Sequence, residues 1–569
     1  MEKNWIIKEP GNPADVDHLV EVLGIDRVLA VLLSQRGIRT FDEAKAFFRP
    51  ELSGLHDPFL MKDMDKAVSR LCKAIDGNEK ILIYGDYDVD GTTAVALVYL
   101  FLKSIYSNIS FYIPNRYDEG YGISIKGIDH AKKEGITLVV ALDCGIKAIE
   151  KIQYARKCKV DFIICDHHFP SDEIPEAVAV LDPKRLDCSY PYKHLSGCGV
   201  GYKFMQALAI SKGVPMEELE QLLDLVAVSI ASDIVPITGE NRILAHFGLK
   251  KLSENPTMGL RSVIKTAGIE NKDITIDDIV FKIGPRINAA GRIESGNRAV
   301  DLLISQDAGL ASSMSDIIND FNNTRKTFDS TITSEALKAL ANDPLVKQKR
   351  ATVLFNPKWH KGVIGIVASR LVESYYRPTV ILTESNGFAT GSARSIDGFD
   401  LYQAVDACSD LLENFGGHMF AAGLTMKLEN VELFKKRFEE VVARNLTEDQ
   451  LIPHIEIDAQ LELSDINPKF YRILKQFQPF GPENMAPVFL TKNVSDNGCG
   501  RAVGSLGGHL KLELIQEAEP FHTYPAIGFQ MGQHWNYIKT GSPFDICYSI
   551  EENEFRGNIT LQIRLRDIK

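Results

Sequence analysis

Short apolar segments alternate with amphipathic ones between residues 79 and 183, and this alternation restricts the fold more than any other feature of the sequence. Strands separated by helices form a parallel sheet that helices cover on both faces, and such sheets bind ligands beyond the carboxyl ends of their strands. The sequence therefore predicts an α/β domain with a site at one edge of its sheet. The predicted strands are 80–84, 110–113, 137–142, 162–165 and 178–181, with helices at 92–104, 125–133 and 147–157.

The rest of the chain predicts three further parts. Residues 301–345 contain few Gly or Pro residues and have a helical rhythm, so we expect a long connecting helix. A second α/β domain follows over 346–450, and residues 451–569 alternate strands with glycine-rich turns, which is typical of a small β-barrel such as an OB-fold. Residues 1–300 are assigned to the first domain and an N-terminal extension. Several domains are expected for 569 residues.

Acidic and histidine residues follow three of the predicted strands. Asp86 and Asp88 follow 80–84, Asp143 follows 137–142, and Asp166-His167-His168 follows 162–165, while Asp233 ends an apolar helix. Carboxylates gathered at one sheet edge repel one another, and burying them unpaired costs several kcal/mol each. A divalent ion compensates for this charge, and oxygen ligands with imidazole suit Mn²⁺ or Mg²⁺. A pair of such ions could activate a water and stabilise an in-line phosphoryl displacement.

Each motif has a simpler interpretation by itself. The segment Asp86–Gly91 begins like the Ca²⁺ loop of an EF-hand, but Leu97 stands where that loop requires Glu, and a strand precedes it. Asp143 alone could cap a helix, and Asp166-His167-His168 alone could be a solvated turn. Their recurrence at successive strand ends favours a shared metal site.

The order of the motifs resembles the DHH phosphoesterase superfamily, and more specifically the RecJ exonuclease family. The resemblance implies a DHH-type parallel-sheet domain joined by a long helix to a DHHA1 α/β domain, followed by a C-terminal OB-like β-barrel. It also implies a single-stranded-DNA-specific 5′→3′ exonuclease that uses two metal ions and acts in DNA recombination and repair. The segments that carry it are GDYDVDG (85–91), LDCGI (142–146), DHH (166–168), SIASDIVPITGENR (229–242), GPRINAAGRIES (284–295) and GGHMFAAG (416–423).

The resemblance assigns roles to residues of the first domain. Asp143 would bridge two metal ions and His168 would contact the scissile phosphate, which makes both catalytic. Related small phosphoesterases have a His four residues before the first Asp of this motif, where this chain has Leu82, so the first ion should be less completely ligated. Asp90 and Asp166 are candidates for orienting the ligands. The implied metal ligands are Asp86, Asp88, Asp143, His167 and Asp233.

Selection of a 5′ end requires a cationic pocket at a fixed distance from the metals, and arginine binds phosphate bidentately. The candidates lie in glycine-rich turns, and each arginine taken alone could be an ordinary surface residue. His418 taken alone could cap a helix. The candidates are Arg116, Arg286, Arg292, Ser392, Arg394 and His418, of which Arg116, Arg292, Ser392 and Arg394 resemble residues that line the 5′-end site of the family.

The composition of the chain bears on its cellular location and its partners. Nine cysteines without a C-x-x-C pair argue against a disulfide framework, and no apolar run approaches the ~20 residues of a membrane span. With no export signal in view, we expect a cytoplasmic protein without a membrane partner. The net charge of −12 counts against tight non-specific binding of duplex DNA. The resemblance implies single-stranded DNA as substrate, with a helicase and a single-strand-binding protein as partners of a monomer.

Three other functions fit part of the sequence. A DHH phosphodiesterase for short oligonucleotides or cyclic dinucleotides would leave the predicted barrel unexplained. A pyrophosphatase of the same superfamily meets that objection too, and Leu82 replaces its histidine. A catalytically inactive DNA-binding scaffold would not need all of the ligand positions, which are intact here.

Overall fold

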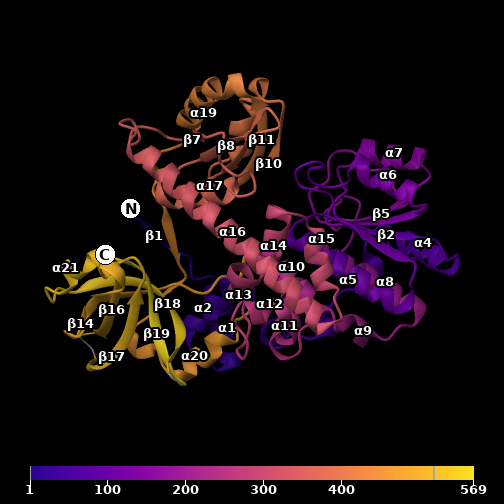
Figure 1. The fold of residues 1–569 in the computed structure, drawn as a ribbon. Helices are drawn as coiled ribbons and strands as arrows, with labels where there is room; N and C mark the ends of the chain where they lie inside the picture. Colours follow the sequence, from indigo (N-terminus) through magenta and orange to yellow (C-terminus); the bar gives the residue numbers. More distant parts are fainter. Residues whose placement is uncertain (1, 517–518, 556) are drawn as a thin grey trace. The chain divides into compact units, whose positions relative to one another are not determined.

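The computed structural model describes residues 2–516, 519–555 and 557–569. Contacts divide the chain into two compact units, each described separately below (Figure 1). The barrel unit comprises Met1–Gly54, Pro236–Thr238 and His454–Lys569, and the α/β unit comprises Leu55–Val235 and Gly239–Pro453. No helix in the described part of the chain has the length and apolar character needed to cross a membrane.

The predicted parallel sheet is confirmed in the α/β unit. Helices α6 (Ile125–Lys133) and α7 (Ile149–Lys157) pack on one face of it, where Leu82, Val139 and Ile164 meet their apolar residues. Helices α4 (Met64–Asp76), α5 (Val89–Ile105) and α8 (Gly197–Lys212) cover the other face. All strands of this sheet are parallel, in the order β3 (Ile109–Tyr112), β2 (Ile81–Gly85), β4 (Leu138–Leu142), β5 (Asp161–Cys165) and β6 (Ala179–Leu181).

Helices between residues 223 and 341 connect this sheet to the second one. Helix α10 (Leu223–Ser232) is buried along nearly its whole length, and α14 (Gly284–Ile293) packs against the long helix α16 (Ala308–Ala341). At its far end, α16 meets α17 (Ile364–Ser374). Arg370 of α17 donates to both carboxylate oxygens of buried Asp329, at 2.8 and 2.9 Å. The connecting helix predicted from the sequence is therefore confirmed, and an ion pair fixes it to the second α/β domain.

The second sheet mixes parallel and antiparallel strands. The glycine-rich turn expected to contain His418 is instead strand β10 (Asn414–His418). Gly417 has a φ of 149°, and a Cβ there would lie 2.2 Å from the carbonyl oxygen of Ala421, so glycine permits this close strand pairing. The elements are β7 (Thr352–Phe355), β8 (Thr379–Ser385), β9 (Phe388–Arg394), α18 (Leu401–Asp406), β10 (Asn414–His418), β11 (Ala421–Lys427) and α19 (Val431–Asn445), with the strands in the order β10-β11-β9-β8-β7.

The barrel unit contains the predicted C-terminal β-barrel and the N-terminal residues. Strand β1 (Asn4–Ile7) pairs in parallel with β12 (His454–Ile457). Helices α1 (Pro13–Leu23) and α2 (Arg27–Gln35) place Leu19 and Leu29 in the same core as Phe489. Residues 1–54 thus pack with the barrel, although the sequence suggested an extension of the first domain. The barrel strands follow the order β13 (Ala459–Gln460), β14 (Phe489–Asp496), β18 (Phe544–Phe555), β19 (Asn558–Ile568), β17 (Glu519–Gly528), β16 (His509–Gln516) and β15 (Arg501–Val503), and pairing of β14 with β16 closes the barrel.

Candidate active site

The acidic and histidine residues converge at the carboxyl edge of the parallel sheet. Asp86 follows β2, Asp143 follows β4, and His167 follows β5. The His167 Nε2 atom lies 3.2 Å from Asp143 Oδ1, 3.5 Å from Asp233 Oδ2 and 3.7 Å from Asp90 Oδ2. Asp233 reaches this point because it directly follows the buried helix α10. Asp143 after β4, Asp233 after α10 and Asp90 near the start of α5 (Val89–Ile105) therefore meet around the imidazole that follows β5.

Two further aspartates form hydrogen bonds with the loops and helices at this edge of the sheet. Asp166 accepts hydrogen bonds from the backbone amides of His167, His168 and Ile146 and from His168 Nδ1. Asp90 accepts from the amides of Gly197 and Cys198, which are the first residues of α8, and from Ser229 Oγ. Protein donors thus satisfy both carboxylates.

The remaining carboxylates lie in an environment that opposes their ionisation. Burial raises the pKa of Asp143 well above its ordinary value, and the charges of Asp90, Asp88 and Asp233 raise it further. Burial and neighbouring carboxylates likewise raise the pKa of Asp86, Asp88 and Asp233. Burial lowers the pKa of His167 to about 4, so its imidazole is neutral and can act as a ligand. A positive charge bound among these groups would remove the repulsion.

Buried polar atoms without hydrogen-bond partners also indicate a bound cation. Among the described residues, Asp86 Oδ2, Asp143 Oδ1 and both ring nitrogens of His167 are buried without a hydrogen-bond partner, which is uncommon in a folded protein. Donor atoms of Asp143, His167 and His168 lie within 4.8 Å of one another, and so do those of Asp90, His167 and Asp233. Carboxylate oxygens with one imidazole suit hard divalent ions such as Mn²⁺ or Mg²⁺. The residues present therefore fit a metal centre.

His168 is prepared to carry a positive charge beside this centre. Burial alone would lower the pKa of His168, but the hydrogen bond from Nδ1 to Asp166 (2.7 Å) and the charges of Asp166 and Asp233 raise it to about 9. Its Nε2 atom lies 3.2 Å from the hydroxyl of Tyr121, which donates to the carbonyl oxygen of Asp143 at 3.0 Å. A cationic imidazole in this position can donate a hydrogen bond to an anionic oxygen.

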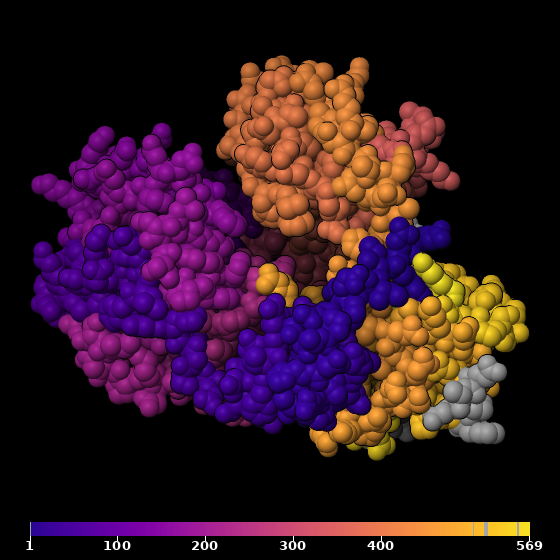
Figure 2. Space-filling model, turned by 180° about the vertical axis from the view of Figure 1, so that it is seen from behind, coloured from indigo at the N-terminus to yellow at the C-terminus, as the bar shows by residue number. Residues whose placement is uncertain are grey.

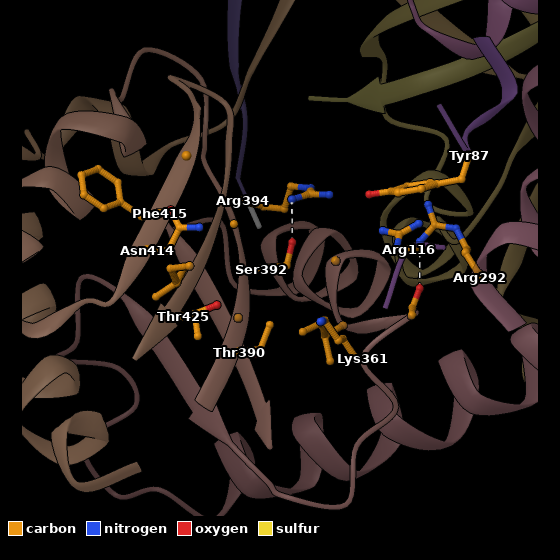
Figure 3. Close-up of a pocket in the computed structure, with 17 residues that line it drawn as sticks. Tyr87, Arg116, Arg292, Lys361, Thr390, Ser392, Arg394, Asn414, Phe415 and Thr425 are labelled. Carbon is orange, nitrogen blue, oxygen red and sulfur yellow. Dashed lines mark hydrogen bonds between the residues drawn. The ribbon is translucent and has the colours of Figure 1, made fainter. Parts of the chain in front are cut away.

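A cavity of about 440 Å³ lies between the two α/β domains (Figure 3). The guanidinium of Arg116 lies over the ring of Tyr87 at 4.9 Å, and Arg394 donates to Ser392 Oγ at 3.0 Å. Arg292 Nη1 donates to the carbonyl oxygen of Gly362 at 2.9 Å. Burial lowers the pKa of Arg292 to about 9, and the charges of Arg116, Arg325 and Arg394 act in the same direction. Several cations thus face one cavity, which suits a phosphate group.

Two predicted residues lie outside this lining. Arg286 donates to Asn319 of α16 and to the carbonyl oxygen of Lys282, so its side chain is engaged on the helices and not in the cavity. His418, at the end of β10, accepts from the amide of Phe420 at 3.2 Å. Burial lowers the pKa of His418, and the charges of Arg394 and His168 lower it further.

Sequence reasoning missed several residues of the site. Tyr87 and Lys361 line the cavity, and Tyr121 bonds to Asp143. Asp182 follows β6 as the other aspartates follow their strands, and burial with the charge of Asp166 raises its pKa to about 7. Gly197 approaches Asp143 so closely that a Cβ would lie 2.6 Å from its side chain. Only Asp182 carried a signal that the strand-end rule could have found.

The parallel sheet, its strand-end ligands and the adjoining cationic cavity define a DHH-type phosphoesterase. Family models agree: residues 80–230 match the DHH family N-terminal domain, 347–444 the DHHA1 domain and 457–567 the RecJ OB domain. The chain is 36% identical over 566 residues to the single-stranded-DNA-specific exonuclease RecJ of Bacillus subtilis, covering 99% of this chain and 70% of that protein. The chain belongs to the RecJ family.

Other members show the same breadth of similarity. The single-stranded-DNA-specific exonuclease RecJ of Escherichia coli is 30% identical over 569 residues, covering 95% of each chain. The crystal structure of RecJ in complex with Mn²⁺ from Thermus thermophilus superimposes with a TM-score of 0.85 at 26% identity, covering 100% of this chain and 79% of that one. The expected order of DHH, DHHA1 and OB-like domains is thereby confirmed.

The repulsion around Asp143 gives a stability prediction of unusual sign. A carboxyl group whose pKa is raised in the folded protein stabilises it less as pH rises above the ordinary aspartate value of about 3.9, by about 1.4 kcal/mol for each pKa unit. In the presence of a chelator at pH 7, Asp143→Asn should therefore unfold at a higher urea concentration than the wild type, and the difference should vanish near pH 3. Urea unfolding followed by circular dichroism measures the midpoint urea concentration of each variant at both pH values.

Saturating Mn²⁺ should reverse the order, because the wild type gains more from binding the ion. Asp172→Asn, at an exposed aspartate, serves as the control and should leave stability unchanged. An Asp143→Asn variant that is less stable than the wild type in chelator at pH 7 would contradict this view of the site.

Proposed function

We propose that this chain is a metal-dependent exonuclease that degrades single-stranded DNA from its 5′ end, in DNA recombination and repair. The observation that carries the proposal is that the strand-end ligands lie in the same compact unit as a cation-lined cavity between the two α/β domains. Relatives that match nearly the whole chain are named single-stranded-DNA-specific exonucleases. A phosphodiesterase for short substrates would have no use for residues 457–567, which match the RecJ OB domain.

The cavity would select the end of the strand. A terminal 5′-phosphate carries more negative charge than an internal phosphodiester, so it gains more from several cations that face one volume. Arg116, Arg292 and Arg394 would hold it, with Ser392 and Lys361 completing the lining. His418, which the charges of Arg394 and His168 reach, would contact the first nucleotide. Arg286 would act only further along the strand, because it lies outside the cavity.

The residues of the sheet edge would carry out hydrolysis. Two ions, Mn²⁺ or Mg²⁺, would be held by Asp86, Asp88, Asp143, His167 and Asp233, and would lower the pKa of a water and neutralise phosphate charge. Protonated His168, held by Asp166, would donate to an oxygen of the scissile phosphate as negative charge develops there. The Tyr121 hydroxyl keeps Nε2 of His168 close to Asp143.

The other parts of the chain would serve this reaction. Beyond residue 54, boundaries near residues 300, 345 and 450 would separate the catalytic domain, the connecting helix, the DHHA1 domain and the barrel. The barrel would hold the single strand, because OB-folds combine stacking aromatics with basic grooves. Because single strands in cells are produced and covered by other proteins, the partners would be a helicase and a single-strand-binding protein. We place the activity in the cytoplasm, in a monomer.

Labelling opposite ends of one substrate tests the proposal. A 5′-phosphorylated single strand carrying a 5′ label should release that label at once as a mononucleotide, whereas the same strand labelled at its 3′ end should give a descending ladder. Blunt duplex DNA should resist, and Asp143→Ala should abolish both signals while circular dichroism shows a folded protein. Release of the 3′ label first, or equal rates on duplex, would contradict the proposal.

The cavity gives a second prediction. Arg394→Ala removes a cation that faces the cavity, so the KM for a 5′-phosphorylated strand should rise roughly tenfold or more, since hydrogen bonds to charged groups contribute about 1.5–3 kcal/mol. The KM for a 5′-hydroxyl strand should change little. Arg298→Ala, at an exposed arginine of α15 (Asn297–Leu303), is the control. An equal loss on both substrates would place the end pocket elsewhere.

A further inference from the structure

An exposed aromatic side chain lies beside the metal centre without a role in the reaction as described. Phe169 directly follows His168, and 73% of its surface is exposed. The ammonium of Lys184 lies over the Phe169 ring, 4.9 Å from its centroid. Lys184 is itself half-buried and lies close enough to Asp182 and Asp233 to interact with their charges. A large apolar ring with a fixed cation at the rim of an acidic site requires an explanation.

The strand order shows where this pair lies along the site. At the carboxyl edge of the sheet, Arg116 follows β3, Asp86 and Asp88 follow β2, Asp143 follows β4, Phe169 follows β5 and Lys184 follows β6. Neighbouring strands are about 4.8 Å apart. The cavity that contains Arg116 therefore adjoins one end of this edge, the carboxylates occupy its middle, and Phe169 with Lys184 lie at the other end.

A hollow separates the domain that contains this edge, drawn in purple, from the second α/β domain, drawn in orange (Figure 2). A strand whose 5′-phosphate occupied the cavity and whose scissile phosphate lay at the carboxylates would continue toward β5 and β6. There it would meet an exposed ring beside a cation, which are the two groups that bind a base and its phosphate in single-stranded nucleic acid.

We propose that Phe169 and Lys184 form a subsite for the nucleotides on the 3′ side of the scissile phosphate, in which a base stacks on Phe169 and Lys184 faces a backbone phosphate. The subsite rests on the proposed function, because it takes its direction from a 5′-phosphate held in the cavity. It is sequence-tolerant, since every base offers a π face. It holds the strand after each cleavage, when the new 5′ end has yet to enter the cavity.

Base fluorescence tests the stacking directly. The full chain carrying Asp143→Ala is mixed with 5′-phosphorylated oligothymidylates that contain one 2-aminopurine, at the second, third or tenth nucleotide. Stacking on Phe169 should quench the probe at the second or third nucleotide and not at the tenth. Adding Phe169→Ala should remove the quenching, and Phe169→Tyr should retain it. Phe59→Ala, at an exposed phenylalanine of the short helix Pro58–Leu60, is the matched control and should also retain it.

Kinetics of otherwise wild-type chains give an independent measure. Phe169→Ala should raise the KM for a 30-nucleotide single strand roughly tenfold, as stacking of one base contributes about 1–3 kcal/mol, and should leave kcat within about twofold. Phe169→Tyr should restore the KM. If the ring only supported folding or metal binding, Phe169→Ala would change kcat as well.

The outcomes separate the two levels of inference. If the wild type fails to degrade the strand from its 5′ end, the proposed function is wrong. If the wild type degrades the strand from its 5′ end, but Phe169→Ala shows the same KM and the same quenching as Phe59→Ala, only the subsite is wrong. A fall in kcat without a change in KM would also overturn it, because the ring would then act on the metal centre and not on the strand.

Discussion

The repulsion among carboxylates at one edge of a parallel sheet is the constraint on which the rest of this structure depends. Parallel strands all end at the same edge, so an aspartate placed after each of β2 and β4 must share a small volume with the histidine after β5. Burial keeps water from screening these charges. The fold tolerates this arrangement because backbone amides, Ser229 Oγ and His168 Nδ1 satisfy Asp90 and Asp166. Asp86, Asp143 and Asp233 are left to attract cations.

The second constraint is geometric, since the proposed 5′-end pocket takes its residues from both sheets of the α/β unit. Arg116 and Arg292 come from the first domain, and Ser392 and Arg394 come from strand β9 of the second. The hydrogen bond from Arg292 to the Gly362 carbonyl joins the two sides directly. The ion pair of Arg370 with Asp329 fixes α16 to α17. Because the cavity and the carboxylates belong to one compact unit, the fold would fix the distance between a bound strand end and the scissile phosphate.

Much of the fold and of the candidate site could be predicted from the sequence, and the features that could not be predicted depend on contacts between distant parts of the chain. Strand-end motifs are local signals, so the parallel sheet and the grouping of Asp86, Asp143 and His167 followed from hydrophobic alternation and one topological rule. Tyr87 and Lys361 join the cavity through packing between domains, which no local pattern encodes. Arg286 shares a glycine-rich motif with Arg292, but six residues along a helix separate their side chains. The pairing of β1 with β12 joins chain segments about 450 residues apart, and a four-residue strand gives no hint of its partner.

The central proposal is that this sheet edge would hold two divalent ions, with Asp143 as a ligand of both. Titration of the metal-free chain with Mn²⁺, followed by the electron paramagnetic resonance signal of free Mn²⁺, measures the stoichiometry without reference to activity. Two ions should bind per chain, and the ion that lacks a ligand at Leu82 should bind more weakly. Asp143→Ala should lose both sites, whereas Asp172→Ala should keep them. Binding of no ion by the wild type, or unchanged stoichiometry and affinity in Asp143→Ala, would contradict it.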